Sequence, residues 1–179
     1  MLRGERVVLR ARRDTDVPIL HTALYDDIGT RLLVDGRPWR PLPVDQSPYR
    51  PSADDGRTDD GRATFTVAQA SDDAPVGAAS LWGIDSHNRL GHLGMSLLPE
   101  YRGRGYGSEV VQLLCRYGFE LRGLHRLQLE TLADNAAMVR TAAAAGFTQE
   151  GVLRGCAWVA GRFVDEAIYG LLADEWHSG

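Results

Sequence analysis

The sequence predicts an α/β (α+β) protein built on a mixed, mostly antiparallel and twisted sheet of about seven strands, with helices on both faces. Two observations lead to this fold class. Strand and helix patterns follow one another in the order β-α-α-β-β-β-α-β-α-β-β, and short turns join several strands directly. A length of 179 residues is enough for a substantial core, so residues 1–179 are expected to form a single domain.

The first third of the chain predicts one strand and two helices. The strand covers residues 6–10, and Asp14 is placed to cap the next helix, which has Pro18 in its first turn. A second short helix covers about residues 28–34. The long irregular segment at about 35–61 contains five prolines and two Asp-Asp-Gly runs. Loops of this length are uncommon in compact domains, and we interpret it as either a surface loop or a lid on the substrate side.

The middle of the chain predicts an antiparallel meander that leads into an amphipathic helix. Three segments rich in β-forming residues cover 63–68, 76–84 and 92–98, and a polar turn at 85–89 joins the second to the third. Beyond a glycine-rich loop, apolar residues recur at helical spacing until the helix ends at Gly123. These apolar residues are Val110, Leu113, Leu114, Tyr117 and Leu121.

The last third of the chain returns to strands. A strand is predicted around residues 127–129, followed by an alanine-rich helix at 134–145, for which Gly146 is a suitable C-terminal residue. Two final strands cover 147–159 and 163–172, with a turn between them. The predicted order of elements places these strands in the same sheet as the meander.

Composition restricts the class of function. The formal net charge of −4 disfavours a nucleic acid or an anionic membrane as partner. The chain has no lysine, which excludes any mechanism that depends on a lysine Schiff base or a phosphate-loop lysine. Its two cysteines form no CxxC pair, so no metal site is expected. The N-terminus lacks the apolar run of a signal peptide, and no apolar stretch approaches the ~20 residues of a membrane span, so a cytoplasmic location is expected.

Residues 101–108, with the sequence YRGRGYGS, place three glycines between a predicted strand and a predicted helix. Glycine lets the backbone approach a ligand closely, and a helix N-terminus offers unpaired N–H groups, so this loop is suited to bind phosphate oxygens. The Walker pattern G-x-x-x-x-G-K-[ST] is excluded because it needs lysine. The Rossmann pattern G-x-G-x-x-G/A also fails, because its last position falls on Ser108 or Val110.

Residues 102–107 fit a third pattern, R/Q-x-x-G-x-G/A, and here the chain resembles the GNAT superfamily of acyl-CoA-dependent N-acyltransferases. The strand end at 96–101, the amphipathic helix and Asn135 follow the spacing of that family. The C-terminal half resembles the RimJ/RimL-like subgroup more closely. The stretches that carry this resemblance are Leu124–Leu127, Asp134–Ala137, Gly146–Arg154 and Asp165–Leu172.

The resemblance implies a GNAT fold and acetyl-CoA (coenzyme A) as co-substrate. Backbone groups of Leu97 and Leu98 are expected to hold the pantetheine arm and to polarise the thioester carbonyl. The side-chain amide of Asn135 is expected to bond the cofactor as well. The pyrophosphate is expected to bind the loop residues Arg102, Gly103, Arg104, Gly105, Tyr106 and Gly107.

Glu130 is the expected catalytic base, since related N-terminal protein acetyltransferases carry a glutamate at the same distance before the asparagine. A surface role for Glu130 is the alternative, and His87 and His92 are the other candidate bases. The positions at which relatives supply an acidic hydroxyl hold Met138 and Ala142 here, so no general acid is assigned. A thiol has an ordinary pKa of ~8.5, so its thiolate can leave without full protonation.

This weakly equipped site favours an acceptor amine of low pKa, and an α-amine has a pKa near 8 whereas a lysine amine has one of ~10.4. The expected acceptor is therefore a protein N-terminal α-amine. Alternatives are a small-molecule amine such as an antibiotic or polyamine, which acidic residues in Asp54–Asp60 are able to attract, and transfer of another acyl group such as succinyl. A non-catalytic CoA-binding module is the rival of a different class. The family also suggests a homodimer.

Overall fold

The computed structural model describes residues 1–34, 38–51 and 61–177. Within these residues one sheet of eight strands has the order β1-β2-β3-β4-β5-β6-β8-β7, and only β5 and β6 pair in parallel. The predicted mixed, mostly antiparallel sheet is confirmed. The strands are β1 (Leu2–Arg3), β2 (Val7–Arg10), β3 (Ala63–Gln69), β4 (Pro75–Asp85), β5 (Leu90–Leu97), β6 (Arg126–Leu132), β7 (Thr148–Val159) and β8 (Arg162–Leu172).

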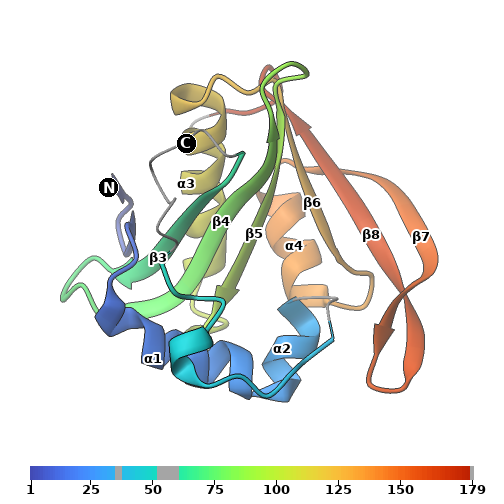
Figure 1. Cartoon of the computed structure of the whole chain (residues 1–179). Helices are drawn as coiled ribbons and strands as arrows, with labels where there is room; N and C mark the ends of the chain where they lie inside the picture. The colour runs from blue at the N-terminus through green and yellow to red at the C-terminus, as the bar shows by residue number, and fades with distance from the viewer. Residues whose placement is uncertain (35–37, 52–60, 178–179) are drawn as a thin grey trace.

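Helices cover both faces of the sheet, as Figure 1 shows. In that view α1 and α2 cross in front of the lower ends of the central strands, whereas α3 and α4 lie behind the sheet. A 3-10 turn at Asp14–Asp16 leads into α1, and wider helical turns extend α1 at His21–Asp26 and α3 at Tyr117–Leu121. The four helices are α1 (Val17–Leu20), α2 (Ile28–Val34), α3 (Tyr106–Arg116) and α4 (Ala136–Ala144).

Two helix starts differ from the sequence prediction. Asp14 does not cap the first helical segment, because Arg13 holds the N-cap position and Asp16 accepts a 2.9 Å hydrogen bond from the Arg13 N–H. In α4 the cap is Asn135, whose side chain accepts from the Met138 N–H at 3.2 Å, so the helix begins after residue 134. At α4 the cap residue itself supplies the accepting oxygen, whereas at the first segment Asp16, inside the segment, accepts from the N-cap residue Arg13.

The main core lies between the sheet and α3. Apolar residues of α3 at helical spacing, such as Val110 and Leu114, are fully buried against Leu127 and Leu129 of β6. Burial of each such side chain contributes roughly 1.5–3 kcal/mol. The first turn of α3 packs very closely on β5, because a Cβ at Gly107 would lie 2.9 Å from Met95 Cε. This packing fixes the N-terminus of α3 beside the end of β5.

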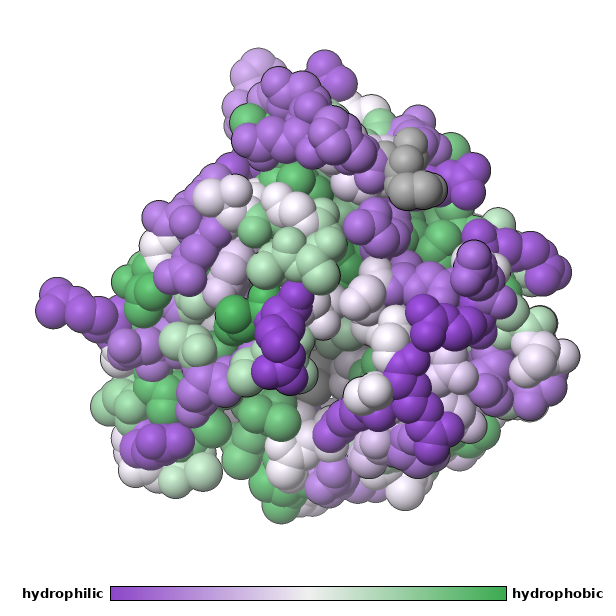
Figure 2. All heavy atoms as spheres, turned by 180° about the vertical axis from the view of Figure 1, so that it is seen from behind, coloured by the Kyte–Doolittle hydropathy of each residue, from purple (hydrophilic) through white to green (hydrophobic). Residues whose placement is uncertain are grey.

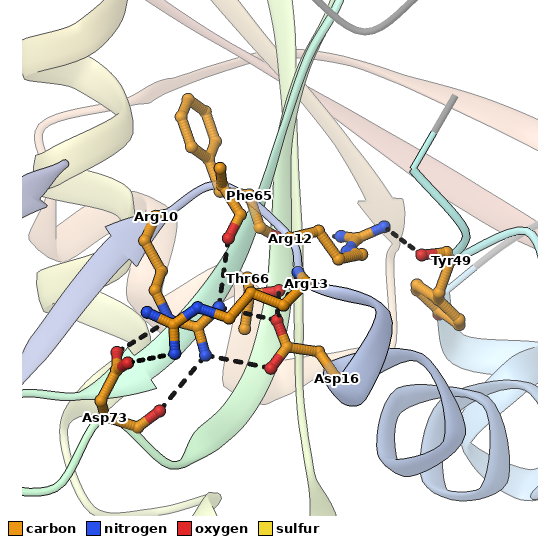
Figure 3. Close-up of polar contacts among 9 residues, drawn as sticks. Arg10, Arg12, Arg13, Asp16, Tyr49, Phe65, Thr66 and Asp73 are labelled. Atoms are coloured by element: carbon orange, nitrogen blue, oxygen red, sulfur yellow. Dashed lines mark hydrogen bonds and ion pairs between the residues drawn. The ribbon is translucent and has the colours of Figure 1, made fainter. Parts of the chain in front are cut away.

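A buried ionic network ties the helical segment that includes α1 to the sheet, as Figure 3 shows. The Arg10 guanidinium binds both carboxylate oxygens of Asp16, at 2.7 and 3.0 Å, and its Nε binds Asp73 at 2.7 Å. Thr66 donates a further hydrogen bond to Asp16 at 2.9 Å. The Arg10 and Asp16 side chains are only 4% and 3% exposed. The network therefore holds β2, β3 and the start of this helical segment in one fixed arrangement.

Strands β5 and β6 separate along their length. They are in register only at Leu90↔Arg126, Gly91↔Leu127 and His92↔Gln128. Figure 1 shows the two strands close together at the top of the view and diverging below, with α4 visible between them. Beyond His92 the edge of β5 that faces β6 has no partner strand among the described residues, so its main-chain groups, apart from the Leu97 carbonyl that accepts from Arg102, have no strand to pair with in this gap.

The outer surface carries few continuous apolar areas on the face viewed in Figure 2. Hydrophilic side chains separate the hydrophobic ones over most of this face, which is opposite to the view of Figure 1. Within residues 1–34, 38–51 and 61–177, no helix combines the length and the apolar character needed to cross a membrane.

Candidate active site

The glycine loop and the start of α3 form an anion-binding geometry. Gly105 occupies the N-cap position with φ of 80° and Gly103 has φ of 72°, a backbone conformation that favours glycine. No side chain caps α3, so the N–H groups of its first turn keep their capacity to bind an external acceptor. The positive end of the helix dipole lies at the same place. The loop therefore has the geometry of a general anion-binding site.

Two arginines near this loop, Arg6 and Arg102, are directed differently. Arg6 donates from Nη1 to the Arg104 carbonyl at 3.1 Å, which places a guanidinium directly over the loop. Arg102 is directed elsewhere, because its Nε donates to the Leu97 carbonyl at 3.0 Å and its Nη2 to Thr30 Oγ1 at 2.9 Å. Arg102 therefore connects the end of β5 to α2. Arg6 was not predicted as a site residue, and no local sequence signal relates it to a loop 98 residues away.

Leu97 and Leu98, the two residues predicted to hold the donor, differ in their main-chain contacts. The Leu98 N–H donates to the Val76 carbonyl at 2.9 Å, and the Leu98 carbonyl accepts from Tyr101 at 2.9 Å, so both groups are used within the protein. Because main-chain groups alternate in direction along an antiparallel pair, the Leu97 N–H points away from β4 and into the gap. Leu97 is thus the better placed of the two.

Asn135 lies at the start of α4, on the β6 side of the gap. Its Oδ1 caps the helix, and its Nδ2 donates to Thr131 Oγ1 at 3.2 Å. A side-chain amide has two N–H groups, so one remains for another acceptor. Met138 is partly buried and Ala142 is fully buried.

Glu130 and His92 meet where β5 and β6 separate. His92 Nδ1 lies 2.9 Å from Glu130 Oε1, and Gln128 donates to the same oxygen at 2.6 Å. The two side chains are 21% and 22% exposed. Trp82 of β4 stacks on the imidazole, with ring centroids 4.5 Å apart and an interplanar angle of 21°. The sequence suggested Glu130 and His92 as separate candidates but gave no sign that they contact each other.

Burial raises the pKa of the Glu130 carboxyl, but hydrogen bonds from His92 and Gln128 outweigh burial and hold this pKa below its ordinary value. Glu130 is therefore a carboxylate at neutral pH. His87, the other histidine considered as a base, is exposed in the β4–β5 turn, where its N–H donates to Asp85 Oδ1 at 2.8 Å. Of the two histidines, the structure brings only His92 to Glu130.

The part of the predicted long segment that the structure describes packs on the helical segment around α1. Tyr25 donates from its hydroxyl to the Arg40 carbonyl at 2.8 Å, and His21 Nε2 lies 3.1 Å from the Leu42 carbonyl oxygen. The segment also contains a 3-10 turn at Val44–Gln46. The acidic stretch Asp54–Asp60, considered for attraction of a cationic substrate, lies outside the described residues.

A family model decides the family. The model of the acetyltransferase (GNAT) domain matches residues 6–148. The chain belongs to this GNAT family. The match includes the glycine loop, the parting strands β5 and β6, Glu130 and Asn135, so the described site lies within the family's domain.

Curated relatives align over part of the GNAT chain. An uncharacterised N-acetyltransferase, p20, from Bacillus licheniformis is 29% identical over 112 residues, which is 63% of each protein. The putative ribosomal N-acetyltransferase YdaF of Bacillus subtilis is 30% identical over 105 residues, covering 59% of this chain and 57% of YdaF. The spermidine N(1)-acetyltransferase of Vibrio cholerae is 25% identical over 107 residues. The chain spans less than two thirds of the length of these relatives.

Solved structures agree with the GNAT fold over nearly the whole chain. A spermidine N-acetyltransferase from Vibrio cholerae, in complex with CoA and spermine, superposes with a TM-score of 0.82 at 21% identity, covering 94% of this chain and 96% of that one. A probable acetyltransferase superposes with a TM-score of 0.78 at 25% identity, covering 97% and 96%. The likeness to the spermidine enzyme confirms the fold.

Proposed function

We propose that this GNAT protein transfers the acyl group of an acyl-CoA, acetyl-CoA by default, to a primary amine by direct attack on the thioester. One arrangement supports this most strongly. The uncapped N-terminus of α3 lies beside the gap between β5 and β6, and the Glu130–His92 pair lies where this gap begins. In this proposal the pyrophosphate would bind near the end of β5, the pantetheine arm would lie along the gap, and the proton acceptor would lie where the gap begins.

Coenzyme A is proposed to bind through main-chain groups. The N–H groups of residues 103–107 would hold the pyrophosphate, with Arg6 and Arg104 adding positive charge. The Leu97 N–H would bind within the gap, and the remaining N–H of Asn135 would bind from the α4 side. Arg102 and Leu98 would support this site from within the protein rather than contact the donor.

The Glu130–His92 pair is proposed to take up the proton that the amine loses. This supplies the acid–base group that the reaction needs and weakens the case for a non-catalytic CoA-binding module. It also weakens the inference that only an amine of low pKa is able to react. No hydroxyl is required at Met138 or Ala142, since the thiolate is a competent leaving group.

For the acceptor we propose a protein N-terminal α-amine in a RimJ/RimL-like enzyme. The ordinary pKa of an α-amine is near 8, so a sizeable fraction is neutral and nucleophilic at pH 7. Similarity to a putative ribosomal N-acetyltransferase over more than half the chain supports this class. Membership of the RimJ/RimL-like subgroup rests on the same relative.

A small polycationic amine is the second candidate, and one observation favours it. Glu130 and Glu166 lie on the same face of the paired strands β6 and β8, because Glu130 is opposite Ile168 and Glu166 is opposite Leu132. Diagonal neighbours of this kind are ~7–8 Å apart, a spacing that suits two ammonium groups of one chain. Similarity to a spermidine N(1)-acetyltransferase supports the same class.

Thiol release with acetyl-CoA tests the proposal, with three acceptor sets supplied in parallel. The sets are peptides with a free N-terminus, the same peptides blocked at the N-terminus, and spermidine with spermine. Intact mass then identifies the acylated product. We expect turnover with the free peptides and none with the blocked ones. If only the polyamines are acylated, the acceptor is a small polycationic amine and not a protein N-terminal α-amine. Absence of thiol release with every amine, together with no heat of binding for acetyl-CoA or CoA, would overturn the transferase proposal.

A further inference from the structure

We propose that His92 Nε2 is the atom that accepts the proton of the attacking amine, and that Glu130 acts through His92 as a positioning residue. This inference rests on the proposed acyl transfer and refines it. The proposed function needs only that the pair takes up a proton. The refinement assigns the proton to one atom and gives the carboxylate a different role.

The position of the imidazole supports this assignment. His92 is the last residue of β5 in register with β6, and Glu130 lies two residues beyond its register partner Gln128. The side chains of Leu93, Leu127 and Leu129 enter the core beneath α3. Since side chains alternate along a strand, those of His92, Gln128 and Glu130 lie on the opposite face. The imidazole therefore bridges the two strands at the point where the gap opens.

The hydrogen bond to Glu130 fixes which imidazole nitrogen is free. A carboxylate only accepts hydrogen bonds, and Nδ1 lies 2.9 Å from Glu130 Oε1, so Nδ1 carries the proton of the neutral ring. Nε2 then holds the lone pair, and among the described residues it has no hydrogen-bond partner. Nε2 is thus free to contact an incoming amine, and the choice between it and Glu130 Oε2, to which neither of these hydrogen bonds goes, depends on which group accepts the proton more readily.

Two residues of β4 shape the position of the ring, one by contact and one by leaving room. Trp82 stacks on one face of the imidazole. The next residue, Gly83, lies in a β-bulge with φ of 58°, and a Cβ there would lie 3.1 Å from His92 Cδ2. A side chain at position 83 would therefore press on the ring. The bulge and the glycine leave room for the imidazole beside the indole.

Glu130 itself is a poor acceptor for the amine proton. Its Oε1 already accepts from His92 and Gln128, and these hydrogen bonds lower the pKa of the carboxyl in spite of burial. General bases work best when their pKa lies near the operating pH, and imidazole is the side chain with an ordinary pKa, about 6.5, closest to neutral. A carboxylate that stays ionised is instead suited to stabilise an imidazolium.

The proposed step balances as follows. The amine lone pair forms a C–N bond to the thioester carbonyl carbon, and the C–S bond breaks with its electron pair leaving on sulfur. One proton passes from the amine nitrogen to His92 Nε2, which gives an imidazolium paired with the Glu130 carboxylate. The products are an amide and a CoA thiolate, and the imidazolium then returns its proton to the thiolate or to water. No further co-reactant is needed.

Steady-state kinetics from pH 5 to 9 tests the assignment of His92 Nε2 as the proton acceptor. The assays use saturating acetyl-CoA and the amine with the highest turnover in the acceptor sets above. The charged groups near His92 are Glu130 and, beyond Gln128, Arg126 with its partner Glu150, while β4 contributes the uncharged Trp82. His92→Asn should lower kcat by ~10²–10⁴-fold and leave the KM for acetyl-CoA nearly unchanged, and it should remove the acidic limb of the kcat profile. Glu130→Gln keeps a hydrogen-bond acceptor for His92 Nδ1. Its kcat should therefore fall less than that of His92→Asn, and the acidic limb of its kcat profile should move to lower pH.

Two further variants separate catalysis from folding. His87→Asn is the matched control, because His87 is exposed in the turn of the same hairpin, and it should keep wild-type kcat and pH profile. His92→Ala should regain part of its activity when imidazole is added, which a purely structural role does not predict. The His92 assignment would be overturned if the wild type turns over and His92→Asn has the same kcat and the same pH profile. It would also be overturned if Glu130→Gln loses activity and His92→Asn does not. Either result leaves the transferase proposal intact. Absence of wild-type turnover with every amine, together with no heat of binding for acetyl-CoA or CoA, would overturn both.

Discussion

Two pairs of a cationic or ionisable side chain with a carboxylate each include a residue of the same sheet, and they differ in how completely their polar atoms are used. In the Arg10–Asp16 pair (Figure 3) both side chains are less than 5% exposed, and Asp73 and Thr66 add further hydrogen bonds. In the His92–Glu130 pair the side chains are about one fifth exposed, and His92 Nε2 has no partner among the described residues.

This difference separates a structural pair from a reactive one. A buried pair with every donor and acceptor satisfied cannot release or take a proton without breaking the network, so it fixes geometry. The His92–Glu130 pair lies at the start of a gap. Its hydrogen bond at Nδ1 fixes the ring, and its free Nε2 is able to react. Charge and proximity alone do not distinguish the two; the count of unused hydrogen-bonding positions does.

The largest expected contrast comes from replacing each carboxylate by its amide. Asp16→Asn removes the buried carboxylate that binds Arg10, which then keeps only the more exposed Asp73 as a charged partner, and should reduce the free energy of unfolding by up to about 3–5 kcal/mol. Glu130→Gln should change it by less than about 1 kcal/mol, because the site is partly open to water. Urea unfolding at pH 7 measures both. Equal losses in the two variants would contradict the distinction between the pairs.

The same contrast should appear in the pH dependence of stability. Burial raises the pKa of Asp16, but hydrogen bonds from Arg10, Arg13 and Thr66 outweigh it and hold this pKa below its ordinary value. A lowered pKa in the folded state stabilises the fold above the ordinary Asp pKa of about 3.9, and this stabilisation is lost as the pH falls through the folded-state value.

Unfolding measured between pH 7 and pH 3 should therefore show a steep loss of stability in the wild type below about pH 4. In Asp16→Asn the curve should be flatter, because the variant has already lost this contribution. Glu130→Gln serves as the comparison, because it removes a different carboxyl group whose pKa is lowered in the folded state. Its stability should still fall nearly as steeply as that of the wild type. If stability falls with pH as steeply in Asp16→Asn as in the wild type, the Arg10–Asp16 pair is not the source of this loss of stability.

The sequence predicted the features that depend on local pattern. The helix at residues 28–34 has the expected bounds, and the glycine loop before α3 was recognised because its glycines, arginines and helix start are contiguous. The added strand β1 has only two residues, too few to show an alternating pattern. The fold class and the geometry of the glycine loop could therefore be predicted from the sequence alone.

The missing parts of the site depend on contacts between distant residues. The His92–Glu130 hydrogen bond joins residues 38 apart, and it requires both the parallel register of β5 with β6 and the end of that register at His92. The internal use of the Leu98 N–H follows from its pairing with Val76, which composition does not encode. Whether a polar residue is satisfied or free is a property of the tertiary structure.

A third test asks whether the glycine loop, like His92, is built for a ligand. Gly105→Ala must take φ of 80° and brings a Cβ 2.8 Å from Arg6 Nη1, whereas Gly161→Ala has the same strain at φ of 86° with nothing near. Left-handed strain costs about 1–2 kcal/mol in each. Calorimetry with CoA should show about tenfold weaker binding for Gly105→Ala only. Equal affinities in both variants would exclude the loop from the donor site.

The smallest expected effect concerns Trp82, which holds one face of the His92 ring. An aromatic pair of this geometry is worth about 0.5–1.5 kcal/mol, so Trp82→Leu should lower kcat by roughly twofold to tenfold if ring orientation limits proton transfer. Trp158→Leu is the control, because Trp158 packs on Phe163 at 4.8 Å in the distant β7–β8 hairpin. Both variants lose a partly exposed aromatic pair, and their unfolding curves should be similar. Only Trp82→Leu should lower kcat, because the free nitrogen of His92 must point in a fixed direction to accept a proton. The geometry of the Arg10–Asp16 pair does not depend on Trp82.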